Sequence, residues 1–207
     1  MRIMIGIFWL LLINGVAQAA TDSMRFAITR NGDPIGTHSI DINRAGQETS
    51  VSIATDLTVK VLFVTAYRFQ HTDNERWLNG HLVALNSTTN NNGAHHTVTV
   101  TAKPPGLDIT ADGKVSRADQ NIMPTSLWSP QFLQRPIMLD TQNGQLMPVS
   151  VVDDGEEALT IKTQTVKTHH YTIKSSFSQD VWYDDQSRLV QARFVASDGS
   201  VIMYQPL

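Results

Sequence analysis

The sequence predicts an all-β protein: a single strongly curved antiparallel sheet, an incomplete or closed barrel of about ten or eleven strands, with one short helix. Runs rich in β-branched and aromatic residues recur at intervals of roughly 8–12 residues, which is the spacing of a sandwich or barrel. Asn, Asp, Gly and Ser separate these runs, and apolar and polar residues alternate within several of them. Neither a shift in composition nor an internal repeat divides the chain, so we expect one domain over residues 21–207.

Residues 1–19 have the three parts of a secretory leader. Arg2 supplies the charge, an apolar run extends from Ile3 to Ile13, and a small-residue cleavage box ends at Ala19. The run is shorter than the about 20 apolar residues that a spanning helix needs. We therefore predict a signal peptide that is cleaved after Ala19 or one residue later, and export to the periplasm or the exterior.

Composition excludes several classes of function. The chain has no cysteine, which excludes disulfides, thiolate catalysis and Cys-ligated metal centres, and which suits a bacterial envelope. Without Arg2 the chain carries 15 basic and 19 acidic residues, a net charge of −4. The basic residues are scattered, so nucleic acid is not an expected partner. We expect no cofactor, and no transmembrane span once the leader is removed.

The N-terminal half reads as strands joined by turns that contain Asn, Gly or Pro. The run 61–71 is apolar on both faces, which indicates that both faces are covered or that one binds a partner. A polar turn at residues 72–74 is expected to end it, and Asn79-Gly80 marks a hairpin. The predicted strands are Met24–Arg30, Ile35–Asn43, Ser50–Val59, Val61–His71, Glu75–Leu78, His81–Leu85, Ala94–Ala102, Leu107–Thr110 and Lys114–Ser116.

The segment 119–135 interrupts this pattern. Ser129 followed by Pro130 has the chemistry of a helix N-cap and first helical residue, which predicts a short helix with Trp128, Phe132 and Leu133 on one face. After it, an acidic turn at residues 153–157 is expected between two strands, and Asp198-Gly199 marks the final hairpin. The predicted strands of this half are Gln145–Val152, Ala158–Gln164, Val166–Ser175 leading into Tyr171–Phe177, Val181–Asp184, Leu189–Ala196 and Val201–Tyr204.

Large aromatic side chains supply the candidate binding site. In an all-β protein Trp77, Trp128, Trp182 and Tyr183 are expected in the core. The alternative is that some aromatic residues line a concave apolar groove, which binds its ligand by burial of apolar surface. The candidate ligand-binding residues are Phe63, Tyr67, Phe69, Trp128 and Phe132.

Polar clusters offer catalytic or metal-binding alternatives. Adjacent histidines of a strand point to opposite faces, so a zinc site would need one residue from each of two pairs together with a third histidine. The segment 153–157 lacks the alternation of a calcium loop, and Ser126 lacks a nucleophile-elbow motif. Two carboxylate pairs have the residue types of a glycosidase. The residues concerned are His95, His96, His169, His170, His71 and His81 for zinc, and Asp73 with Glu75 or Asp180 with Asp184 for the carboxylates.

Several short motifs resemble an uncharacterised family of exported proteobacterial proteins. They are Glu75-x-Trp77-x-x-Gly80-x-Leu82, Pro124-Thr125-Ser126-x-Trp128, Asp140-Thr141-Gln142-x-Gly144, Trp182-Tyr183-Asp184, Leu189-Val190 and Asp198-Gly199-Ser200. The resemblance spans nearly the whole mature chain and implies no catalytic residue. One departure is the turn at residues 185–188, where a glycine is expected. In architecture alone, the long antiparallel strands are similar to the outer-membrane lipoprotein carrier superfamily, which implies an incomplete barrel with a hydrophobic concavity.

These observations predict a periplasmic, non-enzymatic domain that binds a lipid or other apolar ligand in the concave face of its sheet. The segment 124–135 is expected to cover part of the groove. One alternative is an envelope structural or interaction module with a filled core, in which an edge strand or the face of residues 61–69 binds a protein partner. A second alternative is a hydrolase that depends on carboxylates or on a His-bound metal.

Overall fold

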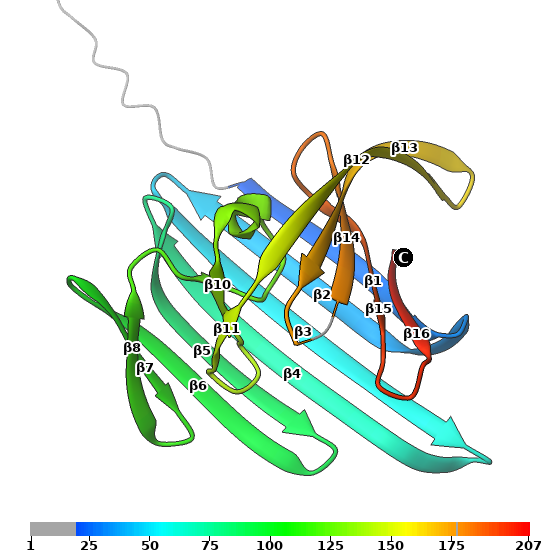
Figure 1. The fold of residues 1–207 in the computed structure, drawn as a ribbon, viewed down its shortest axis with the longest axis horizontal. Coiled ribbons are helices and arrows are strands. Elements are labelled where there is room, and N and C mark those ends of the chain that lie inside the picture. Colours follow the sequence, from blue (N-terminus) through cyan, green and yellow to red (C-terminus); the bar gives the residue numbers. More distant parts are fainter. Residues whose placement is uncertain (1–19, 177) are drawn as a thin grey trace, which may run out of the picture.

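The computed structural model describes residues 20–176 and 178–207, which form one large antiparallel sheet and one small sheet (Figure 1). The large sheet has thirteen strands in the order β12-β13-β14-β15-β16-β1-β2-β3-β4-β5-β6-β7-β8. Its edges, β8 and β12, do not pair with each other, so the sheet stays open. The predicted leader and Phe177, which was expected to end a strand, lie outside the described residues.

Successive strands are joined mostly by short turns, and β1 also pairs with β16, which places the first and last strands side by side in the sheet. The large sheet comprises β1 (Ala20–Arg30), β2 (Asp33–Ala45), β3 (Glu48–Val61), β4 (Val64–Leu78), β5 (His81–Asn91), β6 (Ala94–Lys103), β7 (Gly106–Ala111), β8 (Lys114–Asp119), β12 (Ser150–Ile161), β13 (Gln164–Lys174), β14 (Ser178–Asp184), β15 (Leu189–Val195) and β16 (Val201–Pro206). The connection from β8 to β12 contains the small sheet, β9 (Met123–Pro124), β10 (Ile137–Leu139) and β11 (Leu146–Pro148), and the 3-10 helix η1 (Pro130–Gln134).

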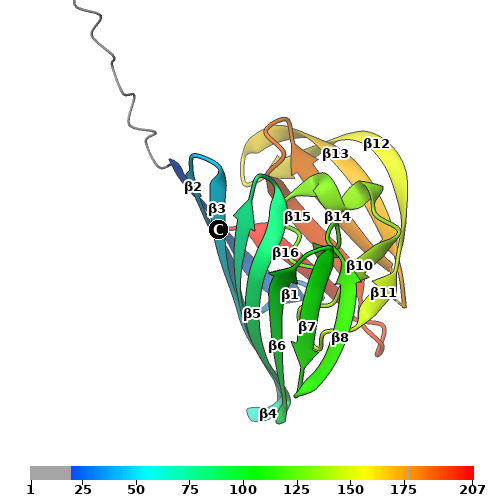
Figure 2. The ribbon, with the colours of Figure 1, turned by 90° about the vertical axis from the view of Figure 1, so that its left-hand side faces the viewer.

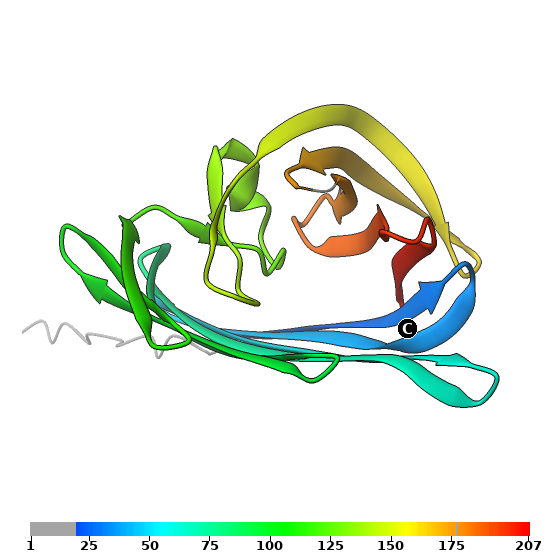
Figure 3. The ribbon, with the colours of Figure 1, turned by 60° about the horizontal axis from the view of Figure 1, so that its bottom comes forward.

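The large sheet curls back over itself. Figures 2 and 3 show β12 to β16 folded over the long strands β1 to β6, with η1 and the small sheet in the gap of the curl. The connection fills this gap with buried apolar side chains, among them Phe132, Met138 and Leu139. They pack into one core cluster with the inward residues of the large sheet, such as Ile40 and Leu85. The connecting segment therefore fills the hollow of the curl instead of only covering it.

The large sheet has thirteen strands, whereas ten or eleven were expected. The prediction of a single sheet was also wrong. β9, β10 and β11 form a separate sheet, in which β9 and β10 run parallel. The helix prediction is confirmed in place, since Ser129 caps η1 and its side chain accepts a hydrogen bond from the backbone N–H of Gln131. η1 is a 3-10 helix of five residues. No described helix has the length and apolar character that crossing a bilayer requires.

Two predicted turns are instead continuous strand. Residues 72–74 lie in the middle of β4, and the turn before β4 is at Leu62 and Phe63. Asp73 looks like a turn residue in the sequence, but it points inward and is buried. The acidic residues 153–157 likewise continue β12, with a bulge between Asp153 and Gly155. They occupy an exposed edge strand, where charged residues and bulges are common because they oppose further pairing.

The β3–β4 turn has an unusual composition. Its two central residues, Leu62 and Phe63, have positive φ angles of 48° and 68°. Tight hairpin turns require such angles, and bulky side chains raise their energy there. The chain places Asn or Asp before Gly in four other turns with the same pair of positive angles, at residues 31–32, 79–80, 92–93 and 112–113.

We expect the double substitution Leu62→Asn with Phe63→Gly to raise the free energy of unfolding by about 1 kcal/mol, because it relieves two strained backbone positions. Chemical denaturation measures the change. The control is Val115→Asn, which alters an exposed residue of β8 and should leave stability within about 0.5 kcal/mol. A clear loss of stability in the double variant would contradict the description of the turn as strained and unpacked.

Candidate functional site

A pair of carboxyl side chains lies at the centre of the concave face. Asp73 and Glu75 occupy successive inward positions of β4 and are 0% and 3% exposed. The indole N–H groups of Trp77 and Trp128 both donate to Oε2 of Glu75, each at 2.7 Å between nitrogen and oxygen. The two indoles meet edge to face, with ring centroids 5.5 Å apart. Glu75 therefore holds Trp128, from the segment before η1, against the large sheet.

The pair holds a proton at neutral pH. Burial raises the pKa of Asp73 to about 9, and the neighbouring Glu75 adds to that rise. Burial also raises the pKa of Glu75, while hydrogen bonds from Ser126, Trp77 and Trp128 oppose the rise. Two carboxyl groups this close in a low dielectric do not both ionise readily. The negative charge accordingly belongs on Glu75, where the indoles stabilise it, and the proton belongs on Asp73.

Both oxygens of Asp73 and Oε1 of Glu75 are buried and accept no hydrogen bond from another described group. A proton on Asp73 that is directed toward Glu75 supplies the missing donor. Such a pair has the chemistry of a general acid and base, but its burial leaves no access for a substrate. In this conformation the pair organises the interior and does not form an open active site.

A row of alternating histidine and threonine crosses the concave face next to the carboxyl pair. His38, Thr55, His71 and Thr89 stand opposite one another on β2, β3, β4 and β5. Nδ1 of His38 lies 2.8 Å from the Thr55 hydroxyl, and Nδ1 of His71 lies 2.9 Å from the Thr89 hydroxyl. Burial lowers the pKa of both histidines to about 4, so the row is neutral at pH 7.

The connecting segment docks on this row through Thr141. Its hydroxyl lies 3.2 Å from Nε2 of His71, and its carbonyl accepts a hydrogen bond of 2.5 Å from Ser87. Gly144 allows the loop to approach the sheet, because it has a φ of +76° and a Cβ there would lie 2.5 Å from Cβ of Ala111. The polar residues of the concave face thus position the segment that fills the curl.

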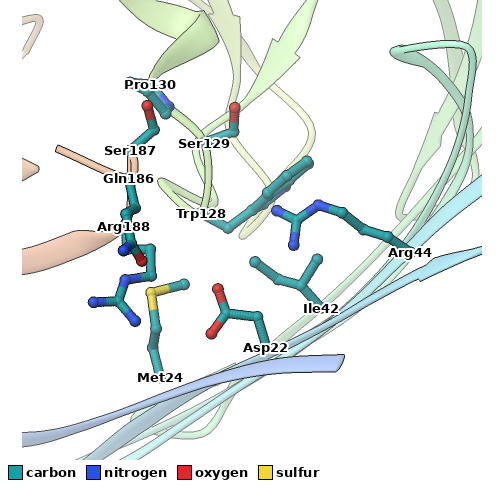
Figure 4. Close-up of a pocket in the computed structure, with 10 residues that line it drawn as sticks. All are labelled: Asp22, Met24, Ile42, Arg44, Trp128, Ser129, Pro130, Gln186, Ser187 and Arg188. Atoms are coloured by element: carbon teal, nitrogen blue, oxygen red, sulfur yellow. The ribbon is translucent and has the colours of Figure 1, made fainter. Parts of the chain in front are cut away.

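An open cleft lies beside Trp128, between the start of β1, the end of β2 and the β14–β15 turn (Figure 4). Its volume is about 210 Å³. Ser187, in the turn where a glycine was expected, adopts a positive φ of 61° and lies in its wall. The lining residues are Asp22, Met24, Ile42, Arg44, Trp128, Ser129, Pro130, Gln186, Ser187 and Arg188.

The charges of the cleft are unevenly paired. Arg188 is bound to Asp184 by two contacts of 2.9 Å from its guanidinium to the carboxylate. Within the described residues, Arg44 and Asp22 form no hydrogen bond or ion pair through their side chains. Arg44 projects into the cleft on the same side as Trp128, and Asp22 lies beside Met24 and Ile42 (Figure 4). The cleft therefore offers one apolar wall, the half-buried indole of Trp128, next to an unpaired cation, while most of its other lining residues are polar and one carboxylate lies at its lower rim in this view.

The five predicted ligand-binding residues do not form one groove. Phe63 is fully exposed at the β3–β4 turn, and Phe132 is buried at 1% in the core. Tyr67 is partly buried and donates a hydrogen bond of 2.8 Å to Asn91, while Phe69 is 9% exposed on the inner face. Only Trp128 of the five lines the cleft. The apolar groove expected beneath residues 124–135 is filled by that segment's own side chains.

Of the predicted catalytic and metal-binding sets, the Asp73–Glu75 pair comes together but is buried, whereas the histidine sets do not come together. The histidine pairs lie on β6 and β13, on opposite sides of the sheet order, and His81 is exposed at the start of β5. Within residues 20–176 and 178–207, no three His, Asp or Glu side chains are grouped so as to hold a metal ion. Asp180 pairs with Arg193 and Asp184 with Arg188, so each acid of that predicted pair has its own cation.

Sequence reasoning missed the two unpaired charges of the cleft. Arg44 precedes a turn and Asp22 follows the predicted leader, so both look like ordinary surface residues. The pairing of β1 with β2 brings Asp22 and Arg44 near each other, and the curl of the sheet then places the β14–β15 turn over these strand ends. No local pattern in the sequence indicates that contact.

Comparison with known proteins agrees with the architecture. A family described as a domain of unknown function, DUF6134, matches residues 26–207. The chain belongs to the DUF6134 family. No curated protein matches this DUF6134 sequence. Among solved structures, a beta-barrel-like protein of domain of unknown function DUF1849 from Brucella abortus is similar over 93% of this chain and 96% of that chain, with a TM-score of 0.62 and 6% identity.

At this identity the similarity shows the fold alone. The expectation of an uncharacterised all-β family is confirmed, and the DUF6134 chain has a beta-barrel-like fold. The export of the family, its proteobacterial origin and its architectural likeness to lipoprotein carriers stay predictions.

We expect the carboxyl pair to make stability fall as pH rises from about 7 to about 9. The folded protein keeps the Asp73 proton in this range, whereas the unfolded chain releases it above about pH 4, so unfolding releases a proton. Asp73→Asn should flatten the dependence of the free energy of unfolding on pH, as measured by urea denaturation at several pH values. The folded histidine row is neutral throughout this range, and in the unfolded chain these histidines lose their last protons just above pH 7.

The control is Asp41→Asn. Asp41 is on β2, and hydrogen bonds from Ser23 and Arg25 lower the pKa of its carboxyl, so it is ionised in both states above pH 7. This variant should keep the wild-type slope between pH 7 and 9. An unchanged slope in Asp73→Asn would show that the buried acid is ionised in the folded protein.

Proposed function

We propose that this DUF6134 protein is a non-enzymatic binding domain of the bacterial envelope that takes an amphipathic, anionic ligand in the cleft beside Trp128. The observation that supports this most directly is the unpaired Arg44 next to an apolar wall that the half-buried indole of Trp128 forms. An anionic headgroup gains a charge-assisted contact at Arg44. The apolar part of the ligand is removed from water against the wall.

The wall is held in place before a ligand arrives. The indole of Trp128 is bound to Glu75 and packs against Trp77, so it loses little freedom on binding. The volume of about 210 Å³ is below the usual range for a drug-sized ligand, so the cleft suits the headgroup and first part of a chain. This proposal moves the predicted ligand from the concave face, which is filled, to the end of the curl.

The envelope location rests on the predicted leader and on the lack of cysteine. The alternative of a partner bound along an edge strand receives less support. β12 carries Asp153, Asp154, Glu156 and Glu157 and a bulge, and all four of these side chains are exposed. Charges and bulges oppose the addition of a further strand.

The test uses the protein without its leader. Dodecanoate is titrated into it at concentrations below the micelle concentration, and isothermal titration calorimetry measures the binding. We expect Arg44→Gln to weaken binding about fivefold, because an exposed ion pair contributes on the order of 1 kcal/mol. Asp22→Asn should tighten binding about twofold, because it removes a nearby negative charge.

Two controls make this result specific. Arg76→Gln removes an exposed arginine from the outward-facing side of β4 and should leave dodecanoate binding unchanged. Dodecanol, which lacks the charge, should bind wild type and Arg44→Gln equally. The proposal fails if the wild-type protein does not bind dodecanoate, or if Arg44→Gln and Arg76→Gln behave alike.

A further inference from the structure

The end of the β3–β4 hairpin is apolar on every side. Val61, Leu62, Phe63 and Val64, which we call the apolar tip, are 55%, 87%, 100% and 68% exposed. Val61 and Val64 stand opposite each other in the last strand pair, and Leu62 and Phe63 form the turn. None of these four side chains is covered by the rest of the described chain.

The tip stands on a ribbon that extends past the neighbouring strands (Figures 1 and 3). β3 last pairs with β2 at Leu57, and β4 first pairs with β5 at Phe69. From Leu57 to Val61 the strand advances about 13 Å, at about 3.3 Å per residue. Over this length β3 and β4 pair only with each other, and residues 60–66 are all exposed. The ribbon therefore presents the tip well clear of the sheet.

The backbone of the turn does not account for the choice of side chains. The chain uses Asn-Gly or Asp-Gly in four turns with the same pair of positive φ angles, and only this one carries two bulky apolar residues. Asn-Gly would satisfy the geometry at lower energy and with better solubility. Leu62 and Phe63 raise the energy of the turn and expose apolar surface, which is consistent with a contact made outside the molecule.

The charged residues around the tip are all basic. Residues 57–72 include no acidic residue. Lys60, next to the tip, is exposed and forms no ion pair with the described residues. Arg68, at the base of the ribbon, lies 3.9 Å from Asp56 between charged atoms. An apolar apex with an unpaired cation one residue behind it matches the order of acyl chains and phosphates in a lipid leaflet.

We propose that the apolar tip inserts into the surface of a lipid bilayer, with Lys60 at the level of the headgroup phosphates. A protein partner covers one face of a hairpin, whereas lipid surrounds an inserted tip on all sides, which matches the exposure of all four side chains. Removal of these side chains from water drives the insertion. The inference does not depend on the cleft, which lies at the opposite end of β3.

Co-sedimentation of the leader-free protein with vesicles of equimolar phosphatidylcholine and phosphatidylglycerol tests the proposal. Wild type should partition to the vesicles, and Leu62→Asn with Phe63→Gly should partition at least about tenfold less, since two large apolar groups are lost. This variant keeps the turn geometry, so a folding defect does not explain the loss. Val115→Asn, which removes a 71% exposed apolar residue elsewhere, should partition like wild type.

A second measurement reports the depth of the tip. Phe63→Trp should show a blue-shifted emission with vesicles and quenching by lipids brominated on their acyl chains, whereas Val115→Trp should show neither. The proposal is overturned if wild type stays in the supernatant, or if the double variant partitions equally well. It is also overturned if sedimentation velocity shows a dimer that the double variant abolishes while Phe63→Trp remains unquenched by lipid, since the tip would then bind a second copy.

Discussion

The fold depends on how one buried negative charge is accommodated. Glu75 lies inside the curl, where an isolated carboxylate is highly unfavourable. Two indole donors and the proton held by Asp73 make the charge tolerable. One of those donors, Trp128, comes from the connecting segment, so the Glu75 carboxylate has both of its indole donors only when that segment is docked. This requirement couples the small sheet to the large one more specifically than apolar packing does, because apolar contacts are not directional.

The same interior explains where sequence reasoning worked and where it stopped. Alternation and turn chemistry predicted the all-β class, most hairpins and the cap at Ser129, since those features depend on neighbouring residues. Polar residues inside strands were mistaken for turns. Asp73 and the segment around Asp153 both resemble turns, yet one is a buried strand residue and the other an exposed edge. Local sequence does not distinguish these states, because the environment is set by strands far away in the chain.

The aromatic residues that were expected to line one groove lie apart for a related reason. Apolar aromatic residues were expected to converge on a groove, but burial and exposure separate Phe132 from Phe63 completely. The segment that was expected to cover the groove supplies the side chains that fill it. The cleft lies at the end of the curl, where charged residues of the β1–β2 hairpin meet the distant β14–β15 turn. A curled sheet of this kind has its free space at its ends, since its hollow is needed for the core.

The cleft and the apolar tip lie at opposite ends of the longest hairpin. β3 has 14 residues and so spans about 43 Å, with Arg44 of β2 beside its start and the tip at its end. With the tip in a bilayer, the cleft lies at the far end of the molecule from that bilayer. A ligand in the cleft would then come from the aqueous side or from an opposing surface, and not directly from the membrane that holds the tip. The two sites are therefore independent in their chemistry but linked in orientation, because the rigid pairing of β2 to β5 fixes the direction of one relative to the other.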